Sequence, residues 1–438
     1  MRQYLAAFAS AAVLSAGASI AQDAEPVTND GSAAYGPVLD GDENARPPTP
    51  SQIPQPLEEA VKTALETSPL IAASIAASEG SAADLRGAKW LRYPNLSVDI
   101  LATTGGSNVA DTDGLAANLA LEQPLFTGGS IAGRIDEARS NLAAAESGVG
   151  ETRQALLLDI TQAYFDVLTY DRQSAVLADG LSLHRDLEAS IARRVAQQVS
   201  PAVDLALAQS RIAQLEADYS SAKESAEIAR LQLFELVGAE VPAPALPQDV
   251  PLLAFESEAA ALGEALACNP TLRARSSLVD AAEARYDTAK AELWPRLLFQ
   301  LSQNELTGAR AALVLRAQTG NGLSKLSNID GAEAEIAQAL AQLAQSDRQV
   351  RTLVRREFAR YRSSQRSMEA STMAAGSAAE LLESYKRQYT AGRRTWLDVL
   401  NALGEVVDAR RRVAQDQVTL ASSAALILAL TCRWQPEA

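Results

Sequence analysis

The sequence lacks most of the residue sets on which enzymes and metal proteins depend. It holds one histidine and two cysteines, with no Cys pair at metal-ligand spacing, no Gly-rich phosphate loop and no GxSxG. An enzyme would have to work with carboxylates alone, so we expect no catalytic residue, no metal and no cofactor. His184, beside Arg185 and Asp186 in a long helical segment, is expected on a solvated helix face.

Aromatic residues and long apolar runs are also scarce. Aromatics make up 5% of the chain, and the apolar content is largely alanine, which favours closely packed, extended helices over a bulky globular core. The longest apolar run after the N-terminus, residues 421–430, is too short for a membrane helix, whereas the short strands of a membrane β-barrel remain compatible. A net charge of -15 argues against nucleic acid or anionic lipid as a partner.

The N-terminus has the pattern of a secretory signal. Arg2 precedes an apolar run, and small residues at Ser19 and Ala21 suit cleavage, so residues 1–21 are predicted to be a signal peptide. Residues 22–55, rich in Pro, Gly, Asp and Asn, are predicted to form a flexible leader. No cysteine lies near the junction, so a lipid-anchored N-terminus is not expected.

The rest of the chain is a tandem duplication. Residues 64–96 align without a gap on 265–297, placing Pro69 on Pro270 and Pro94 on Pro295. Downstream the offset falls from 201 to 194, so the second copy has lost seven residues between about 298 and 330. The predicted organisation is a first repeat at 56–240, a linker at 241–257, a second repeat at 258–434 and a tail at 435–438.

Both copies show the same order of elements. A Pro-initiated helix of about 25 residues precedes two short extended runs around a Gly-rich turn. A very long helix follows, at about 130–197 and about 326–390, and then a break and a returning helix. At about 1.5 Å per residue the long helices span roughly 100 Å, so they must form a rod or tube.

The predicted fold is therefore mainly α with a small β part, namely a long coiled-coil barrel with four strands per chain. Four strands cannot close a β-barrel, and an open sheet would leave edges that self-associate. Three chains would supply twelve strands, which can close.

Several segments of the chain resemble the TolC family of outer-membrane efflux proteins. They are ALETSPL, ALACNPTL, EQPLFTGGSIAGRIDEA, LLLDITQAYFDVL and YTAGRRTWLDVLNA, and the resemblance covers about residues 57–434. It implies a homotrimer with a twelve-stranded β-barrel in the bacterial outer membrane, continued by an α-helical tunnel into the periplasm. It also implies two partners at the lower end, a periplasmic adaptor and an inner-membrane transporter of the ABC or proton-driven type.

The function expected from this resemblance is a passive exit duct. The segment TGNGLSKLS, with GRRTWLDVLNA later, resembles the branch that serves type I secretion of adhesin-like proteins more than it resembles the drug-efflux members. Protein secretion is therefore favoured. A small-molecule or drug efflux duct for a proton-driven pump is the alternative. A soluble periplasmic coiled-coil scaffold is a third possibility, which would require the expected strands to be loops.

The break at residues 388–402 combines helix capping with extra residues. Thr395 can cap the returning helix with Asp398 three residues on, and Gly392 supplies the turn. Asp204 and Asp398 are in that case first-turn acids favoured by the helix dipole. Capping does not explain the nearby Tyr389 and Arg394.

The family resemblance implies a gate at these breaks. Tyr389 and Arg394 fall on the gate tyrosine and arginine, and Asp204 falls on their acidic partner in the first repeat. Asp398 falls on the first constriction aspartate. Asn401 stands where the family has a second aspartate, so a trimer would keep one ring of carboxylates.

Four aromatic residues stand near the expected joints between helices and strands. Trp90, Tyr93 and Trp294 precede the helix-ending prolines, and Phe126 ends a hairpin. They suit the periplasmic rim of a membrane barrel, but ordinary packing at such a joint explains them equally well.

Helix lengths place Cys268 and Cys432 at a similar height along the tube. An oxidising periplasm would permit a disulfide between them. Two separate buried thiols are the favoured arrangement, because the lengths do not fix the angle of each cysteine around the tube.

Overall fold

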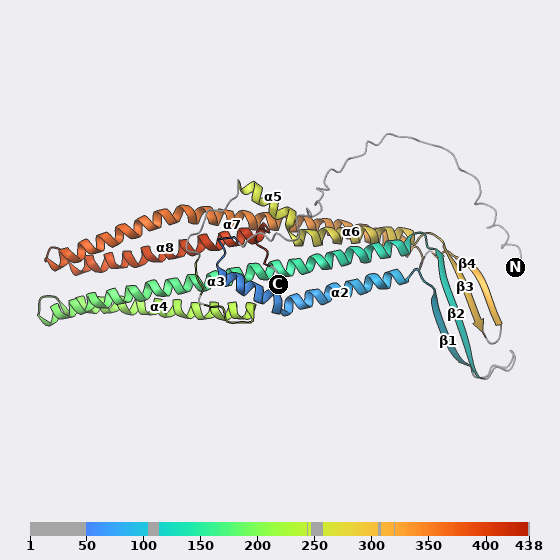
Figure 1. Ribbon diagram of the computed structural model, residues 1–438, viewed down its shortest axis with the longest axis horizontal. Helices are drawn as coiled ribbons and strands as arrows, with labels where there is room; N and C mark the ends of the chain where they lie inside the picture. The colour runs from blue at the N-terminus through green and yellow to red at the C-terminus, as the bar shows by residue number, and fades with distance from the viewer. Residues whose placement is uncertain are drawn as a thin grey trace, which may run out of the picture. The chain divides into compact units, whose positions relative to one another are not determined.

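The computed structural model describes residues 50–103, 114–242, 244–246, 257–304, 308–318 and 320–436. The first repeat contains α1 Gln55–Thr67, α2 Pro69–Trp90, β1 Asn95–Thr103, β2 Gly114–Phe126, α3 Ser130–Ala196 and α4 Ala202–Val237 (Figure 1). The second contains α5 Glu258–Cys268, α6 Pro270–Ala291, β3 Arg296–Asn304, β4 Gly308–Arg316, α7 Ser324–Thr390 and α8 Trp396–Leu430. The predicted mainly helical tandem repeat with four strands is confirmed.

The predicted signal peptide and most of the predicted leader lie outside the described residues. The leader was expected to reach residue 55, but Ile53 is already buried with Leu57 in the core, and α1 begins at Gln55. Proline at the start of α1 favours this early helix, because its fixed φ suits the first turn. The leader prediction is therefore too long at its C-terminal end.

Local chemistry sets the start of the second helix in each repeat. Pro69 and Pro270 occupy the first helical turn, where a missing backbone N–H costs nothing. The side chains of the preceding residues, Ser68 and Asn269, accept hydrogen bonds from backbone N–H groups of that turn. The same pair of signals therefore separates α1 from α2 and α5 from α6.

The seven-residue deletion falls in the connection between two strands. Residues 104–113 join β1 to β2, whereas residues 305–307 join β3 to β4. On either side of these connections the repeats match, and α3 and α7 both contain 67 residues. At about 1.5 Å per residue each long helix spans roughly 100 Å, as predicted.

The four strands form one antiparallel sheet in the order β1-β2-β3-β4. Within each repeat the strands form a hairpin, and β2 pairs with β3 to join the two repeats. Among the described residues, β1 and β4 each pair on one side, so both edges of the sheet are open.

The two faces of the sheet differ in charge and in their share of large apolar residues. Directly paired residues share a face and successive residues alternate, so the register assigns every side chain. One face, the apolar face, carries Leu96, Val98, Ile100, Leu119, Leu121, Leu297, Phe299, Leu301, Leu313 and Leu315, together with the uncharged polar Gln123 and Gln303. The other, the polar face, carries Asn95, Ser97, Asp99, Asn118, Glu122, Arg296, Gln300, Ser302, Arg310 and Arg316, together with the apolar Leu298 and Val314. All five charged residues of the strands lie on the polar face.

Helix α3 is the centre of the helical packing. It packs against α2 and α4 of its own repeat and against α6 and α8 of the second repeat. The largest core cluster surrounds Tyr164 and Phe165 of α3. The Tyr164 hydroxyl donates to the carbonyl of Ala245 at 2.9 Å and accepts from its N–H at 2.8 Å, which ties the inter-repeat linker to α3.

Helix α8 is apolar enough to be compared with a membrane span. Among the described helices it is the one that is long and apolar enough to cross a membrane, with a mean hydropathy of 1.4 over 18 residues. However, 67% of that window is buried inside the protein. We therefore interpret α8 as a core helix.

His184 is not on a solvated surface, so that prediction is wrong. Its side chain is buried, with 4% exposed, and Nδ1 lies 2.8 Å from the carbonyl oxygen of Gly180. A Cβ at Gly180 would approach Val407 of α8 to 2.8 Å. Because α8 comes from the other repeat, the helical pattern of α3 alone could not reveal that this face is covered.

Candidate functional site

The two turns between the long and returning helices form the candidate gate. Residues 197–201 join α3 to α4, and residues 391–395 join α7 to α8, both at the ends of the long helices away from the strands (Figure 1). In the first turn, backbone N–H groups of Val199 and Ser200 donate to the carbonyl of Arg194 at 2.9 and 3.3 Å. In the second turn, Gly392 adopts φ +71°, a left-handed conformation that glycine tolerates best.

The predicted capping box at the start of α8 is confirmed. The Thr395 hydroxyl accepts from the backbone N–H of Asp398, and the Asp398 carboxylate accepts from the backbone N–H of Thr395, both at 3.2 Å. The Thr395 hydroxyl also donates to this carboxylate at 2.8 Å, and this bond lowers the pKa of Asp398 below its ordinary value. The carboxylate therefore stays ionised over the whole neutral range.

Arg394 makes its contacts within the second hairpin. Its Nε donates to Gln388 at 3.3 Å, and its guanidinium lies 4.3 Å from the centre of the Tyr385 ring. A third contact, 3.7 Å from Nη1, reaches Asp398. In the described part of the chain, no hydrogen bond or ion pair joins Asp204 to Arg394 or Tyr389. The predicted contact with Asp204 is thus not made inside one chain.

Tyr389 instead meets a residue that the sequence did not single out. The guanidinium of Arg194, at the end of α3, lies 5.2 Å from the centre of the Tyr389 ring, at the end of α7. Within the described residues, the Tyr389 hydroxyl and Arg194 Nε are both buried without a hydrogen-bond partner. We call this contact between the α3–α4 and α7–α8 helical hairpins the Arg194–Tyr389 clasp. The repeat offset of 194 places Arg194 on Gln388, beside the gate tyrosine, and this alignment could have pointed to it.

An apolar cluster from both repeats lies behind the clasp. Its buried members are Leu187, Ile191, Ala208, Leu382, Val399, Leu400, Ala402, Leu403 and Val406, and Tyr385, Tyr389 and Trp396 pack against it. The hairpin ends are therefore held in one packed unit. Asn401 points away from this cluster and is exposed, and Asp398 is about one third exposed.

The structure separates the four predicted interface aromatics. Phe126 pairs with Leu297 and so lies on the apolar face of the sheet. Trp90 and Tyr93 make a tilted ring contact, with ring centres 5.0 Å and planes 51° apart, and line a cavity together with polar-face residues. Trp294 is exposed and lies against the turn at Gly128. A location at the membrane interface stays a prediction for all four.

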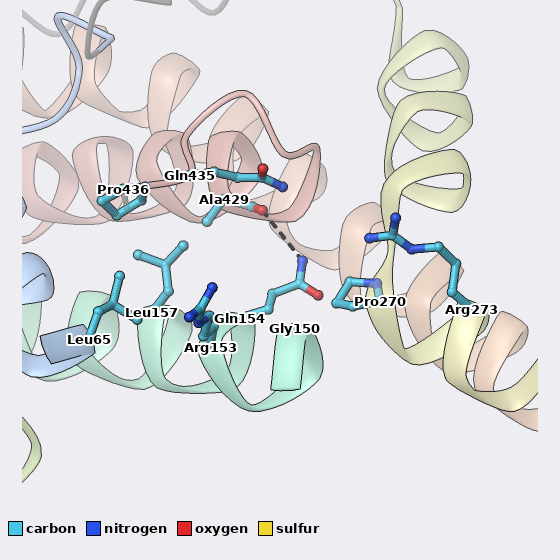
Figure 2. A pocket seen from close by; sticks show the side chains of 10 residues that line it. All are labelled: Leu65, Gly150, Arg153, Gln154, Leu157, Pro270, Arg273, Ala429, Gln435 and Pro436. Atoms are coloured by element: carbon cyan, nitrogen blue, oxygen red, sulfur yellow. Dashed lines mark hydrogen bonds between the residues drawn. The ribbon is translucent and has the colours of Figure 1, made fainter. Parts of the chain in front are cut away.

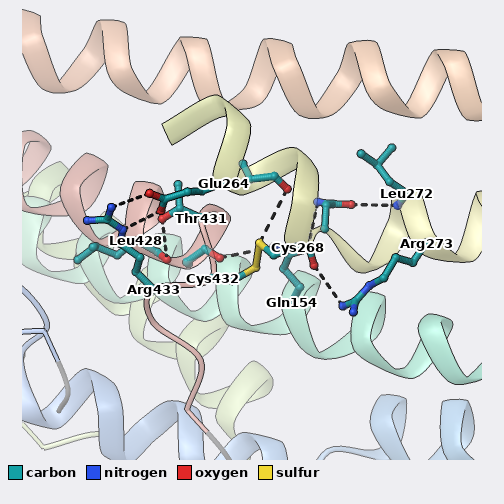
Figure 3. The surroundings of a disulfide bond; sticks show 12 residues. Gln154, Glu264, Cys268, Leu272, Arg273, Leu428, Thr431, Cys432 and Arg433 are labelled. Atoms are coloured by element: carbon teal, nitrogen blue, oxygen red, sulfur yellow. Dashed lines mark hydrogen bonds and ion pairs between the residues drawn. A yellow bond between two sulfur atoms is a disulfide. The ribbon is translucent and has the colours of Figure 1, made fainter. Parts of the chain in front are cut away.

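The two cysteines form a disulfide, so the prediction of separate thiols is wrong. Cys268 and Cys432 have Cα atoms 6.4 Å apart across 164 positions of sequence, and their predicted similar height is confirmed. Next to them, Arg433 Nε and Nη2 donate to the two carboxylate oxygens of Glu264 at 2.8 and 2.7 Å (Figure 3). The end of α8 is thereby fastened to the junction of α5 and α6.

A cavity of about 230 Å³ lies close to this disulfide. Figure 2 shows Gln154, Pro270, Arg273 and Ala429 among the residues around it, with the Gln154 amide donating to the Ala429 carbonyl at 3.5 Å. In the described segments, no group of three or more His, Cys, Asp or Glu could hold a metal ion.

These observations define a class of protein. A sheet with one apolar and one polar face, joined to helices of 67 residues that turn back at capped hairpin ends, is the architecture of an outer-membrane channel subunit. The sequence matches the outer membrane efflux protein family over residues 60–239 and 261–431, and the chain belongs to that family.

Individual relatives agree with this family. The chain is 26% identical to the protein CyaE of Bordetella pertussis over 398 residues, which is 85% of this chain and 83% of that protein. Two solved structures share the fold. VceC of Vibrio cholerae has a TM-score of 0.73 at 19% identity and covers 86% of this chain and 96% of its own. The CmeC outer membrane channel of Campylobacter jejuni has a TM-score of 0.75 at 14% identity and covers 95% and 94%.

Family membership determines the location and the general role. The protein is a channel of the bacterial outer membrane, and its helices form the periplasmic tunnel. It acts as the outer-membrane efflux channel of a tripartite system, and members of the family are transport ducts rather than enzymes.

Proposed function

We propose that three copies of this chain form one exit duct, opened at the hairpin ends and supplied by a periplasmic adaptor and an inner-membrane transporter. The observation that carries the proposal is the division of the sheet into two faces. An Arg or Lys side chain facing lipid costs about 2–4 kcal/mol at the bilayer centre and less near the interfaces, and Asp or Glu costs less, yet Asp99, Glu122, Arg296, Arg310 and Arg316 all share one face. That face would line the water-filled lumen, and the leucine-rich face would contact lipid.

Open edges on β1 and β4 support the trimer. Unpaired strand edges in a membrane leave backbone groups without hydrogen bonds, which the hydrocarbon core does not tolerate. β1 of one chain can pair with β4 of the next in the antiparallel sense, because the two strands run in opposite directions. Three chains would close a barrel of twelve strands.

The helices give a second, independent reason to expect neighbours. Within the chain, α3 packs against α6 and α8 of the next repeat, but α7 makes no comparable contact with α2 or α4. By repeat symmetry those helices would come from the adjacent chain. Accordingly α2 buries Ile71 and Leu85, whereas α6 buries seven residues, and α4 leaves Leu231 and Phe234 exposed.

The gate would open when the hairpin ends separate. Inside each chain the Arg194–Tyr389 clasp joins the two hairpins, and Arg394 is held by its own hairpin. A contact of Tyr389 or Arg394 with Asp204 would have to cross to a neighbouring chain. One ring of Asp398 carboxylates would line the throat, and Asn401 would leave the next position uncharged.

The substrate is proposed to be a protein of the adhesin type, exported by a type I system. The support is the TGNGLSKLS and GRRTWLDVLNA wording of the second repeat. Small-molecule efflux with a proton-driven pump is the second candidate, because the architecture serves both. Identifying the inner-membrane transporter that co-purifies with the protein distinguishes them, since an ATP-driven exporter supports secretion and a proton-driven pump supports efflux.

The duct itself is tested by fractionation and single-channel recording. We expect the protein in the outer-membrane fraction, migrating as a trimer on an unboiled gel and forming channels in a planar bilayer. Arg394→Ser should raise the mean conductance without changing trimer yield, whereas Arg393→Ser, at the exposed neighbouring position, should not. A soluble monomer would overturn the duct, and equal conductance of both variants would overturn the role of Arg394.

A further inference from the structure

Three arginines line one cavity where the sheet meets the helices. The cavity has a volume of about 500 Å³, and its wall includes Trp90, Tyr93, Glu122, Arg134, Arg296 and Arg316. We call Arg134, Arg296 and Arg316 the arginine collar. Their side chains are between 38% and 48% exposed, so solutes can reach them.

The sheet register places two of these arginines side by side. Arg296 of β3 lies directly opposite Arg316 of β4 on the polar face. Like charges at directly opposite positions destabilise a sheet, so this pairing needs compensation. Glu122 supplies part of it at 3.7 Å from Arg316 Nη2, and the amide of Gln300 donates to the same carboxylate at 2.6 Å.

Glu292, at the end of α6, compensates the remaining arginines. Its carboxylate lies 3.0 Å from Arg134 Nη2 and 3.7 Å from Arg296 Nη2. Its backbone carbonyl accepts from Lys325 Nζ at 2.5 Å, which brings a fourth cation to the group. With Glu137 of α3, whose carboxylate also interacts with Arg134, four cations meet three carboxylates, an excess of positive charge in a chain whose net charge is -15.

The arginine collar and the adjacent rings of Trp90 and Tyr93 together suit one class of ligand. Guanidinium groups bind carboxylates with paired hydrogen bonds and remain charged at every physiological pH. The rings of Trp90 and Tyr93, in tilted contact and 67% and 59% exposed, offer an apolar surface next to these cations. A ligand that uses both carries an anionic group on an apolar or aromatic body.

We propose that the arginine collar is an anion-binding site in the wall of the duct, which favours organic carboxylates over cations at the base of the barrel. The inference rests on the proposed trimeric duct, because the polar face must line its lumen. It assigns Trp90 and Tyr93 to the solute pathway in place of the membrane interface predicted for them from the sequence.

The charge component is tested with ion selectivity. Reversal potentials in a KCl gradient give the anion-to-cation permeability ratio of the trimer in a planar bilayer. Arg296→Gln and Arg316→Gln should each lower this ratio about twofold at low salt, and less at high salt because of screening. Arg316→Lys should retain the ratio.

Arg310→Gln is the matched control. It removes the same charge from the same face of β4, but six residues along the strand, roughly 20 Å from Arg316. Its effect should be clearly smaller than that of Arg316→Gln. Equal effects of the two variants would show that lumen charge acts everywhere alike and would overturn the collar.

The aromatic component is tested with benzoate and acetate. At equal concentration in KCl, benzoate should reduce the single-channel current more than acetate does, because its ring also contacts Trp90. Trp90→Ala should remove this difference and leave the KCl selectivity in place. If benzoate and acetate act alike on the unmodified channel, the site for organic anions is refuted while the duct stands. Purified protein that forms no channel would refute both proposals.

Discussion

Substitutions at Tyr389 separate two ways in which this residue could hold the gate closed. In the structure its ring lies under Arg194, while its buried hydroxyl has no hydrogen-bond partner among the described residues. We therefore expect Tyr389→Phe to keep the gate closed, because only an unpaired polar group is removed. Tyr389→Leu should open it, because the aromatic ring is lost.

The size of the effect follows from the clasp. A cation–π contact contributes about 0.5–1 kcal/mol at a partly exposed site. Three clasps in a trimer then contribute about 1.5–3 kcal/mol, which corresponds to a change of about 13- to 160-fold in the ratio of open to closed channels. Tyr389→Phe should change that ratio by less than about twofold.

The assay is the open probability of single channels in a planar bilayer, with trimer yield on an unboiled gel as the folding control. Arg194→Gln should match Tyr389→Leu, and the double variant should add little, since both remove the same contact. If Tyr389→Phe opens the channel as much as Tyr389→Leu, the hydroxyl holds the gate. That result would refute the clasp and favour a bond from Tyr389 to Asp204 of a neighbouring chain.

Three further predictions concern stability. Cys268→Ser with Cys432→Ser should lower the free energy of unfolding by about 2–5 kcal/mol, and an unchanged melting temperature, with or without reductant, would contradict this. Burial lowers the pKa of His184, so the unfolded chain takes up the proton first as pH falls through 6.5. The melting temperature should therefore drop between pH 8 and pH 5.5 more steeply than in His184→Gln, and parallel curves would exclude the effect. Tyr164→Phe removes two hydrogen bonds to Ala245 and should cost about 1–2 kcal/mol, with faster proteolysis of the linker as the readout.

Features that depend on nearby residues were predictable from the sequence. Pro69 and Pro270 start helices through their own backbone geometry, and Thr395 with Asp398 forms the cap that their spacing predicts. The predicted strand and helix bounds agree with the structure within a few residues, because each element occurs in both repeats and could be compared between them. The apolar and polar alternation along the strands likewise carries their two-faced character.

Features that depend on packing between the repeats were not predictable. His184 is buried on the side of α3 where Gly180 meets α4 and α8, and helical periodicity in α3 does not show which partner covers each face. The repeat alignment could mark Arg194 as the counterpart of Gln388, but the Arg194–Tyr389 clasp joins the ends of two different helical hairpins, so the alignment does not show the contact itself. For Cys268 and Cys432, helix lengths gave the height correctly, but the angle around the axis decides between a disulfide and two thiols.

Packing of α3 on α6 and α8 inside one chain, with the matching surfaces of α2, α4 and α7 left over, has a consequence for how the channel is made. Any incomplete assembly, whether one chain or two, still presents one donor surface and one acceptor surface, together with two strand edges. In the proposed trimer, closing the ring would remove all of them in a single step. Partial assemblies would therefore keep exposed association surfaces and strand edges and would be short-lived in the periplasm. The cell would contain finished channels and unassembled chains, with few intermediates.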